Sequence, residues 1–172
     1  HLHGVIGDPE ANRAARASDP AAAGQLGGLL DAVDNNAPRQ APRRQGLLIA
    51  ITSARGLRNA DFLPCSGVSD PYCVCVIGGR VRARTQVVMN CLNPVWNHEQ
   101  RIRDYSIGDP LVFAVYDKDF MKFDDFLGTV RLDSGQFYPG GFEGELFLEK
   151  AGKGITAFLK VKVLPFEASA PS

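Results

Sequence analysis

Residues 155–163 read ITAFLKVKV, and apolar and polar side chains alternate along them. In an extended strand, successive side chains point to opposite faces of the sheet. The apolar face of this segment comprises Ala157, Leu159, Val161 and Val163. Lys160 and Lys162 fall on the other face. The segment is therefore predicted to be a β-strand that buries only one of its sides.

Seven further segments either alternate in the same way or are continuously rich in strand-forming residues, and turn residues separate them. They are residues 47–53, 71–77, 80–88, 97–102, 111–116, 127–132 and 145–149. Eight such strands suit an antiparallel β-sandwich. We therefore expect an all-β fold, in which no helix longer than about two turns is needed.

A change in composition divides the chain. All aromatic residues lie at or after Phe62, whereas residues 1–45 are rich in Ala, Gly, Pro and Arg. Residues 38–45 read PRQAPRRQ, a composition typical of an extended linker. We expect an extension over residues 1–45, a sandwich over residues 46–166 and a short tail over residues 167–172.

The extension contains a helical pattern, formed by Leu26, Leu29, Leu30 and Val33. Two interpretations stay open. The pattern is either a docking helix for a protein partner or a marginal helix that forms only against a partner or not at all. The neighbouring Gly27 and Gly28 favour the second interpretation, because a short helix that contains glycine is unstable alone.

Charge and hydropathy limit the classes of partner. Lys plus Arg and Asp plus Glu number 19 each, so the net charge gives no indication of nucleic acid binding. Any electrostatic function must come from local clustering. No apolar run approaches the roughly 20 residues that span a bilayer. We therefore expect any membrane contact to be peripheral, at a cytosolic face, with the compartment left open.

The four cysteines, at positions 65, 73, 75 and 91, include no CxxC pair. Cys73 and Cys75 alternate along a predicted strand in the manner of small hydrophobic residues. We expect all four to be reduced, because a chain of this size does not need disulfides to fold. The alternative is one or two disulfides in an oxidising compartment.

Five aspartates lie in two segments between predicted strands: Asp61 and Asp70 in one, and Asp117, Asp119 and Asp125 in the other. Loops after alternate strands of a sandwich emerge at the same end, so the two segments can converge. Carboxylates about 5 Å apart repel by roughly 3 kcal/mol per pair at an effective dielectric constant of about 20. A calcium ion, which prefers oxygen ligands, would remove this repulsion. Zinc would require more His or Cys than these loops contain. Taken alone, each aspartate is better explained as a turn-capping residue, and only the joint spacing of the five favours a metal site.

Several short motifs occur together in a fixed order. They are ARGL at 54–57, SDPY at 69–72, RT at 84–85, LNPVWN at 92–97 and DKDFMKFDDFLG at 117–128. In this order they resemble the C2 domain family, whose members are β-sandwiches that bind calcium and phospholipid. A strand pattern follows at 155–163 and none precedes Leu47, which resembles the circularly permuted type II topology of that family.

The resemblance implies a calcium site whose side-chain ligands are Asp61, Asp70, Asp117, Asp119 and Asp125, with the carbonyl oxygens of Phe62 and Lys118 as additions. All five expected acids are present. Two positions depart from the family pattern. Eight residues separate Asp61 from Asp70, about three more than in a common form of the motif, and His98 stands where many members have Glu.

The same loops contain apolar residues beside the acids, which is unusual for a plain surface loop. Phe62, Leu63, Phe120 and Met121 are predicted to enter the lipid interface once calcium has neutralised the loops. Packing of Leu63 and Phe123 against a neighbouring loop or the extension is the alternative for those two residues.

Arg80, Arg82 and Arg84 alternate with Val81, Ala83 and Thr85, which predicts three guanidinium groups on one face of a strand. In C2 domains, this surface often binds phosphoinositide or protein. A solvated strand face is the alternative, because lipid-binding clusters usually contain about four to eight basic residues.

The sequence therefore predicts calcium-dependent binding of anionic phospholipid membranes by a peripheral module. The competing hypothesis is a protein-interaction module in which the sandwich is a scaffold subunit and the acids do not act through calcium. An enzyme is not expected, because Cys65 and Cys91 have no convincing His partner and His98 lies in no recognisable catalytic site.

Overall fold

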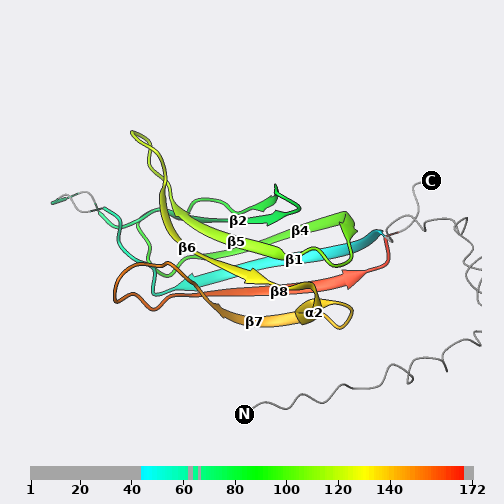
Figure 1. Ribbon diagram of the computed structural model, residues 1–172. Coiled ribbons are helices and arrows are strands. Elements are labelled where there is room, and N and C mark those ends of the chain that lie inside the picture. The colour runs from blue at the N-terminus through cyan, green and yellow to red at the C-terminus, as the bar shows by residue number, and fades with distance from the viewer. Residues whose placement is uncertain (1–43, 62–63, 66, 169–172) are drawn as a thin grey trace, which may run out of the picture. The chain divides into compact units, whose positions relative to one another are not determined.

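The computed structural model describes residues 44–61, 64, 65 and 67–168 (Figure 1). The helical pattern within residues 26–33 and the loop residues Phe62 and Leu63 lie outside this range. In the described part of the chain, no helix has the length and apolar character that crossing a membrane requires.

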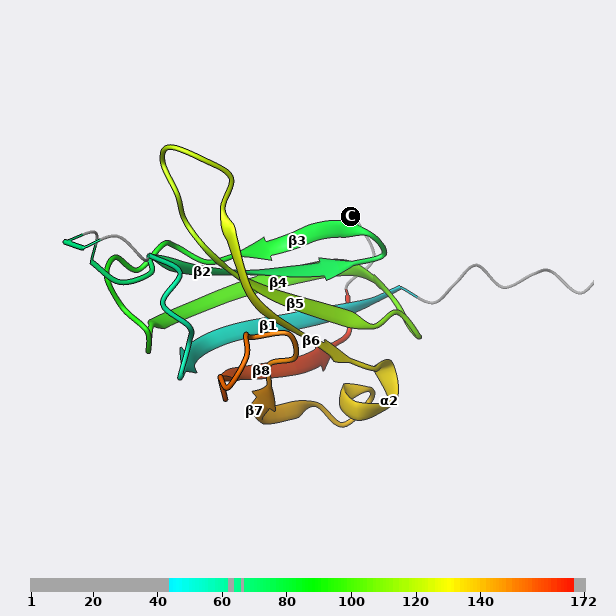
Figure 2. The same cartoon turned by 60° about the vertical axis from the view of Figure 1, so that its left-hand side comes forward.

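The described residues contain eight strands in two four-stranded antiparallel sheets that stack face to face (Figures 1 and 2). The first sheet has the order β4 (Val95–Ser106), β1 (Arg44–Arg55), β8 (Phe158–Phe166), β7 (Phe142–Phe147). The second has the order β3 (Arg80–Arg84), β2 (Pro71–Ile77), β5 (Leu111–Asp117), β6 (Asp125–Leu132). A single helical turn, α2 (Ser134–Phe137), connects β6 to β7. The predicted eight-stranded sandwich is confirmed, and the last strand, β8, lies between β1 and β7.

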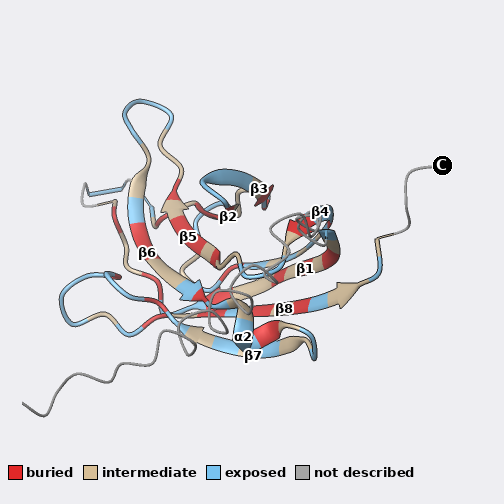
Figure 3. Cartoon of the chain, turned by 45° about the vertical axis from the view of Figure 1, so that its right-hand side comes forward, coloured by how far each residue is buried: buried red, intermediate tan, exposed pale blue. Residues whose placement is uncertain are grey.

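Alternating apolar side chains form the core between the sheets. Figure 3 shows buried positions interleaved with less buried ones along the strands. In the first sheet, β1 and β8 pair so that their fully buried residues share the inner face: Leu47, Ile49 and Ile51 with Leu159, Val161 and Val163. Phe113 of β5 belongs to the same buried cluster. Removing each such side chain from water contributes about 1.5 to 3 kcal/mol, so this core accounts for most of the driving force for folding.

Most strand boundaries differ from the predictions by a few residues, and for β3 and β7 the difference has a local cause. β3 ends at Arg84 rather than at residue 88. The backbone N–H of Cys73 donates to the Thr85 hydroxyl (2.9 Å) instead of to a backbone carbonyl of the neighbouring strand, so the regular pairing stops there. β7 covers Phe142–Phe147 rather than residues 145–149, because Glu149 pairs with Thr129 of β6. β8 begins at Phe158 rather than at residue 155.

The expectation of three arginines on one face of β3 is wrong. A register shift in the β2–β3 pair interrupts the alternation, so that Arg80 lies opposite Ile77 and Arg84 lies opposite Val74. Ile77 belongs to the main core, whereas Val74 belongs to a smaller cluster on the outer face. Arg82 forms an ion pair with Asp104 of β4, and the Arg84 guanidinium lies 4.4 Å from the centre of the Tyr72 ring. The three charges therefore do not form one free basic surface.

All four cysteines are described, and all are free, as expected. Cys73 and Cys75 are buried on the core side of β2, and burial raises the pKa of the Cys75 thiol to about 12. Cys65 is exposed, and Cys91 is half-buried.

The two ends of the sandwich carry different connections. We define the loop end by the connections 56–70, 85–94, 118–124 and 148–157, and the closed end by the connections 78–79, 107–110 and 133–141. In Figure 1, the β1–β2 and β5–β6 connections project from the loop end. All five candidate calcium ligands lie in or next to these two connections.

Candidate calcium site

Asp117 joins the two acidic segments. It is the last residue of β5, pairs with Pro71 of β2, and is only 3% exposed. Its Oδ1 accepts a hydrogen bond from the backbone N–H of Asp70 (2.6 Å), and the Lys118 N–H donates to the Asp70 carbonyl (3.0 Å). The ends of the β1–β2 and β5–β6 connections, 47 residues apart in sequence, are therefore fixed side by side.

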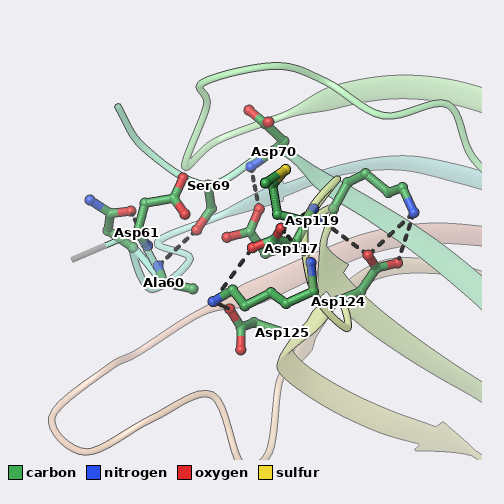
Figure 4. A network of polar contacts seen from close by, with 12 residues as sticks. Ala60, Asp61, Ser69, Asp70, Asp117, Asp119, Asp124 and Asp125 are labelled. Atoms are coloured by element: carbon green, nitrogen blue, oxygen red, sulfur yellow. Dashed lines mark hydrogen bonds and ion pairs between the residues drawn. The ribbon is translucent and has the colours of Figure 1, made fainter. Parts of the chain in front are cut away.

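The β5–β6 connection folds around Asp119. Its Oδ1 accepts hydrogen bonds from the backbone N–H groups of Met121 (2.7 Å) and Lys122 (3.1 Å), and the Met121 bond is the main reason that the pKa of Asp119 is lowered. The Lys122 Nζ lies 3.0 Å from Asp125 Oδ2 and 3.5 Å from Asp119 Oδ2. A lysine ammonium group thus bridges two of the predicted ligands (Figure 4).

Asp124 also shapes this connection, although the sequence did not identify it as a site residue. Its carboxylate accepts hydrogen bonds from the Tyr72 hydroxyl (2.5 Å), the Asp119 N–H (3.0 Å) and the Lys118 ammonium (3.3 Å). The Tyr72 bond is the largest cause of its lowered pKa. Burial and this bond raise the pKa of Tyr72 to about 12. Asp124 therefore acts as the anchor that fixes the loop to β2.

Asp61 faces the other acids across the loop end. Partial desolvation and then the charges of the other acids Asp117, Asp70 and Asp119 raise the pKa of its carboxyl group. Asp61 therefore lies within electrostatic reach of three further predicted ligands. Such mutual repulsion is the property that a bound cation would relieve.

The β1–β2 connection is held by polar contacts that no sequence pattern predicted. The Ser69 hydroxyl accepts a hydrogen bond from the Ala60 N–H (2.8 Å) and donates to the Arg58 carbonyl (3.2 Å). The Arg58 guanidinium donates to the carbonyl of Phe126 in β6 (2.7 Å). The segment that precedes Asp61 is therefore attached to both neighbouring acidic segments.

The acids are close together but do not form a finished cage. Within residues 44–61, 64, 65 and 67–168, no group of three or more His, Cys, Asp or Glu side chains is arranged to hold a metal ion. The contacts give the reason. Asp70 Oδ1 accepts from the Asn90 N–H (2.6 Å), Asp117 Oδ1 accepts from the Asp70 N–H, and the Lys122 ammonium pairs with both Asp119 and Asp125. In Figure 4, the Asp70 carboxylate points away from those of Asp117 and Asp119.

The donor set nevertheless fits calcium. All five predicted ligands are carboxylates, and the neighbouring backbone carbonyls add further oxygen donors, which matches the preference of calcium for six to eight oxygen ligands. This region contains six aspartates, of which Asp124 pairs with the ammonium group of Lys118, and Asp119 and Asp125 pair with that of Lys122. The local charge is therefore negative and would favour a divalent cation.

The β5–β6 connection presents large apolar side chains to solvent. Phe120 is 74% exposed, Met121 is 95% exposed and Phe123 is 96% exposed. The alternative in which Phe123 packs against a neighbouring loop is therefore wrong. Phe120 lies only 6.0 Å, ring centre to Nζ, from Lys118. These three side chains form an apolar tip on the acidic connection, which we call the loop tip.

A family model for the C2 domain matches residues 45–147, which is more than half of the chain. The chain therefore belongs to the C2 domain family.

Relatives with this domain differ widely in size. The protein C2-DOMAIN ABA-RELATED 11 of Arabidopsis thaliana is 43% identical over 91 residues, which is 51% of this chain and 50% of that protein. Tricalbin-2 of Saccharomyces cerevisiae is 39% identical over 96 residues, which is 56% of this chain and 8% of that protein. Extended synaptotagmin-1 of Pongo abelii is 30% identical over 131 residues, covering 73% of this chain and 12% of that protein. The chain thus spans half or less of the length of these relatives.

Solved structures agree on the fold. A C2 domain of plant extended synaptotagmin 1 superposes with a TM-score of 0.65 at 22% identity, covering 76% of this chain and 100% of that one. Human GIVD cytosolic phospholipase A2 gives a TM-score of 0.63 at 26% identity, covering 76% of this chain but only 17% of the enzyme. The similarity to the enzyme is thus limited to a small part of it.

Proposed function

We propose that this domain binds anionic phospholipid membranes in a calcium-dependent manner, as a peripheral membrane module. The observation that carries the proposal is the contact between Asp117 and the Asp70 backbone, which places acids from two connections together beside an exposed apolar loop tip. The candidate ligands are Asp61, Asp70, Asp117, Asp119 and Asp125, and the carbonyl of Lys118 is a further donor.

The proposed role of calcium is electrostatic. Without the ion, the negative charge of the loop end opposes approach to anionic headgroups. With the ion, part of the carboxylate charge is balanced, and lipid phosphate can complete a coordination shell that the protein alone leaves unfilled. Calcium would thus weaken the repulsion between this end of the domain and the membrane and add a direct contact with lipid phosphate.

The proposed role of the loop tip is hydrophobic. Phe120, Met121 and Phe123 are exposed in water, where their apolar surface gains nothing. Their transfer into the lipid interface would contribute at most about 1.5 to 3 kcal/mol for each fully buried side chain. Phe62 and Leu63 of the other connection are proposed as additional inserting residues from their position beside Asp61.

The scaffold hypothesis has one observation in its favour. Lys122 already pairs with two of the acids without any metal ion, so part of the negative charge is balanced inside the chain. In that case the loop end would be a surface for a protein partner, and calcium would have no effect on binding.

Sedimentation with vesicles separates the two hypotheses. The full chain should sediment with phosphatidylcholine/phosphatidylserine vesicles in calcium and remain in solution in a chelator. Asp117→Asn with Asp119→Asn should abolish the calcium effect. Asp109→Asn with Glu99→Gln, which changes the net charge equally but away from the loop end, should retain it. Equal sedimentation in calcium and chelator would reject the proposed function.

A further inference from the structure

We propose that the Lys122 ammonium group is an internal competitor of calcium, which calcium must displace and which then joins the membrane contact of the loop tip. This inference rests on the proposed function and adds the residue that sets the calcium affinity. It also assigns one side chain opposite effects on two successive steps, binding of the ion and binding of the membrane.

The geometry of the connection places Lys122 over the ligands. Asp119 holds the Lys122 backbone through its Oδ1, while its Oδ2 lies 3.5 Å from the ammonium of the same lysine. The ammonium also contacts Asp125 Oδ2 at 3.0 Å. The side chain thus contacts two predicted calcium ligands that lie near the two ends of the connection.

The second lysine of this connection shows that the arrangement is specific. The ammonium of Lys118 contacts Asp124, which anchors the loop to Tyr72 and is not a predicted side-chain ligand. Among the ion pairs of the described residues, those of Lys122 are the ones that involve predicted ligands. Lys122 rather than Lys118 therefore competes directly for the ligand oxygens.

Calcium and the ammonium cannot share these oxygens. Both are cations, so a calcium ion held by Asp119 and Asp125 repels the ammonium group that contacts Oδ2 of the same two carboxylates. Binding of calcium must therefore release Lys122. The free energy needed to break its ion pairs lowers the apparent affinity for calcium. Because the Lys122 side chain is 57% exposed, solvent screens this pair, and the expected effect is about two- to tenfold.

The released lysine would lie beside the apolar residues of the loop tip. Its neighbours Met121 and Phe123 are almost fully exposed, so the released ammonium would lie between two side chains that face the lipid. A lysine at an anionic membrane surface strengthens attachment about fivefold. The same residue would therefore weaken binding of calcium in solution and strengthen binding to an anionic membrane.

Lys122→Gln tests both effects, with Lys153→Gln as the control. Lys153 is an exposed lysine of the β7–β8 connection, also at the loop end, and no ion pair of the described residues involves it. In calorimetric titration without lipid, Lys122→Gln should lower the Kd for calcium by about two- to tenfold, and Lys153→Gln should leave it within error. Thermal melting in chelator checks that each variant is folded.

The second arm uses vesicles at saturating calcium. Lys122→Gln should reduce affinity for phosphatidylcholine/phosphatidylserine vesicles by about fivefold and leave affinity for pure phosphatidylcholine vesicles unchanged. If the parent and the variant bind calcium with the same Kd, the inference is overturned while the proposed function stands. A drop in the Kd without the change in vesicle binding would overturn the membrane step. If neither protein binds calcium, the proposed function fails and the inference fails with it.

Discussion

The closed end and the loop end of the sandwich differ in the surroundings of their polar and apolar side chains. At the closed end, Tyr105 and Phe137 are each 1% exposed and pack with ring centres 5.7 Å apart. The Tyr105 hydroxyl donates to the Asp109 carbonyl (2.7 Å) and lies 3.0 Å from the Ser134 hydroxyl, which accepts from the Gly108 N–H (3.2 Å). The polar groups of this end are therefore satisfied by the chain itself.

At the loop end, by contrast, carboxylates crowd together and large apolar side chains face the solvent. This arrangement adds little to stability, because repelling charges and exposed aromatics gain nothing from folding. It becomes favourable only when a cation and an apolar surface are supplied from outside. The comparison indicates that the closed end stabilises the fold and the loop end serves binding.

The largest expected difference is in the rate of thiol modification, between a cysteine in the interior and a cysteine at the loop end. Cys75 is buried with a pKa raised to about 12, whereas Cys65 is exposed in the β1–β2 connection. Because the thiolate is the reacting species, Cys65 should react with a maleimide at about pH 7.5 at least about a thousandfold faster than Cys75. Mass spectrometry of the labelled peptides over time measures the ratio. Comparable rates in the folded protein would show that the core opens readily.

Matched phenylalanine variants should differ strongly in stability. Phe137→Ala at the closed end removes a ring that is 1% exposed and should lower the free energy of unfolding by about 3 to 5 kcal/mol. Phe123→Ala removes a ring that is 96% exposed and should change it by about 0.5 kcal/mol or less. Urea denaturation measures both values. A large loss for Phe123→Ala would mean that the loop tip packs on the domain.

Calcium should stabilise the folded domain through the loop end alone. A ligand that binds only the folded state contributes about 2.7 kcal/mol at a concentration about 100 times its Kd. The melting temperature should therefore rise in calcium, and magnesium should have much less effect, because it accepts irregular oxygen cages poorly. Differential scanning calorimetry measures the shift. An unchanged melting temperature in millimolar calcium would favour the scaffold hypothesis.

Truncation of the loop tip should have the smallest effect, and only on membrane binding. Phe120→Ala with Met121→Ala should weaken binding to anionic vesicles at saturating calcium by about 1 to 3 kcal/mol, because insertion buries only part of each side chain. The Kd for calcium without lipid should stay nearly the same. Ile107→Ala at the closed end is the control. If the double variant sediments as well as the parent, the loop tip does not insert.

The sequence predicted the sandwich because its strands carry regular patterns. β8 alternates clearly, and Leu159, Val161 and Val163 are buried as expected. β4 was predicted over residues 97–102 but covers Val95–Ser106, because its outer positions are mostly charged or polar and its ends show little alternation. The prediction that Arg80, Arg82 and Arg84 share one face was wrong for a related reason. A bulge that changes the register cannot be recognised from the spacing of residues in the sequence.

The candidate site could be predicted only as a set of residues. The position of the acids in two connections predicted their convergence, which the contact between Asp117 and Asp70 bears out. The roles of Asp124 and Lys122 depend on how the β5–β6 connection folds back on itself, and side-chain contacts of this kind have no periodic signature. The adjacent acids Asp124 and Asp125 were the one available signal that a second carboxylate was present.

Calorimetric titration of calcium into the lipid-free protein tests the central claim most directly. The parent chain should show saturable binding, and Asp117→Asn with Asp119→Asn should show none while still unfolding in one cooperative transition. The Asn side chains can still accept the hydrogen bonds from the backbones of Asp70, Met121 and Lys122, so the fold should be retained. No binding by the parent, or the same isotherm for parent and variant, would contradict a calcium site at the loop end.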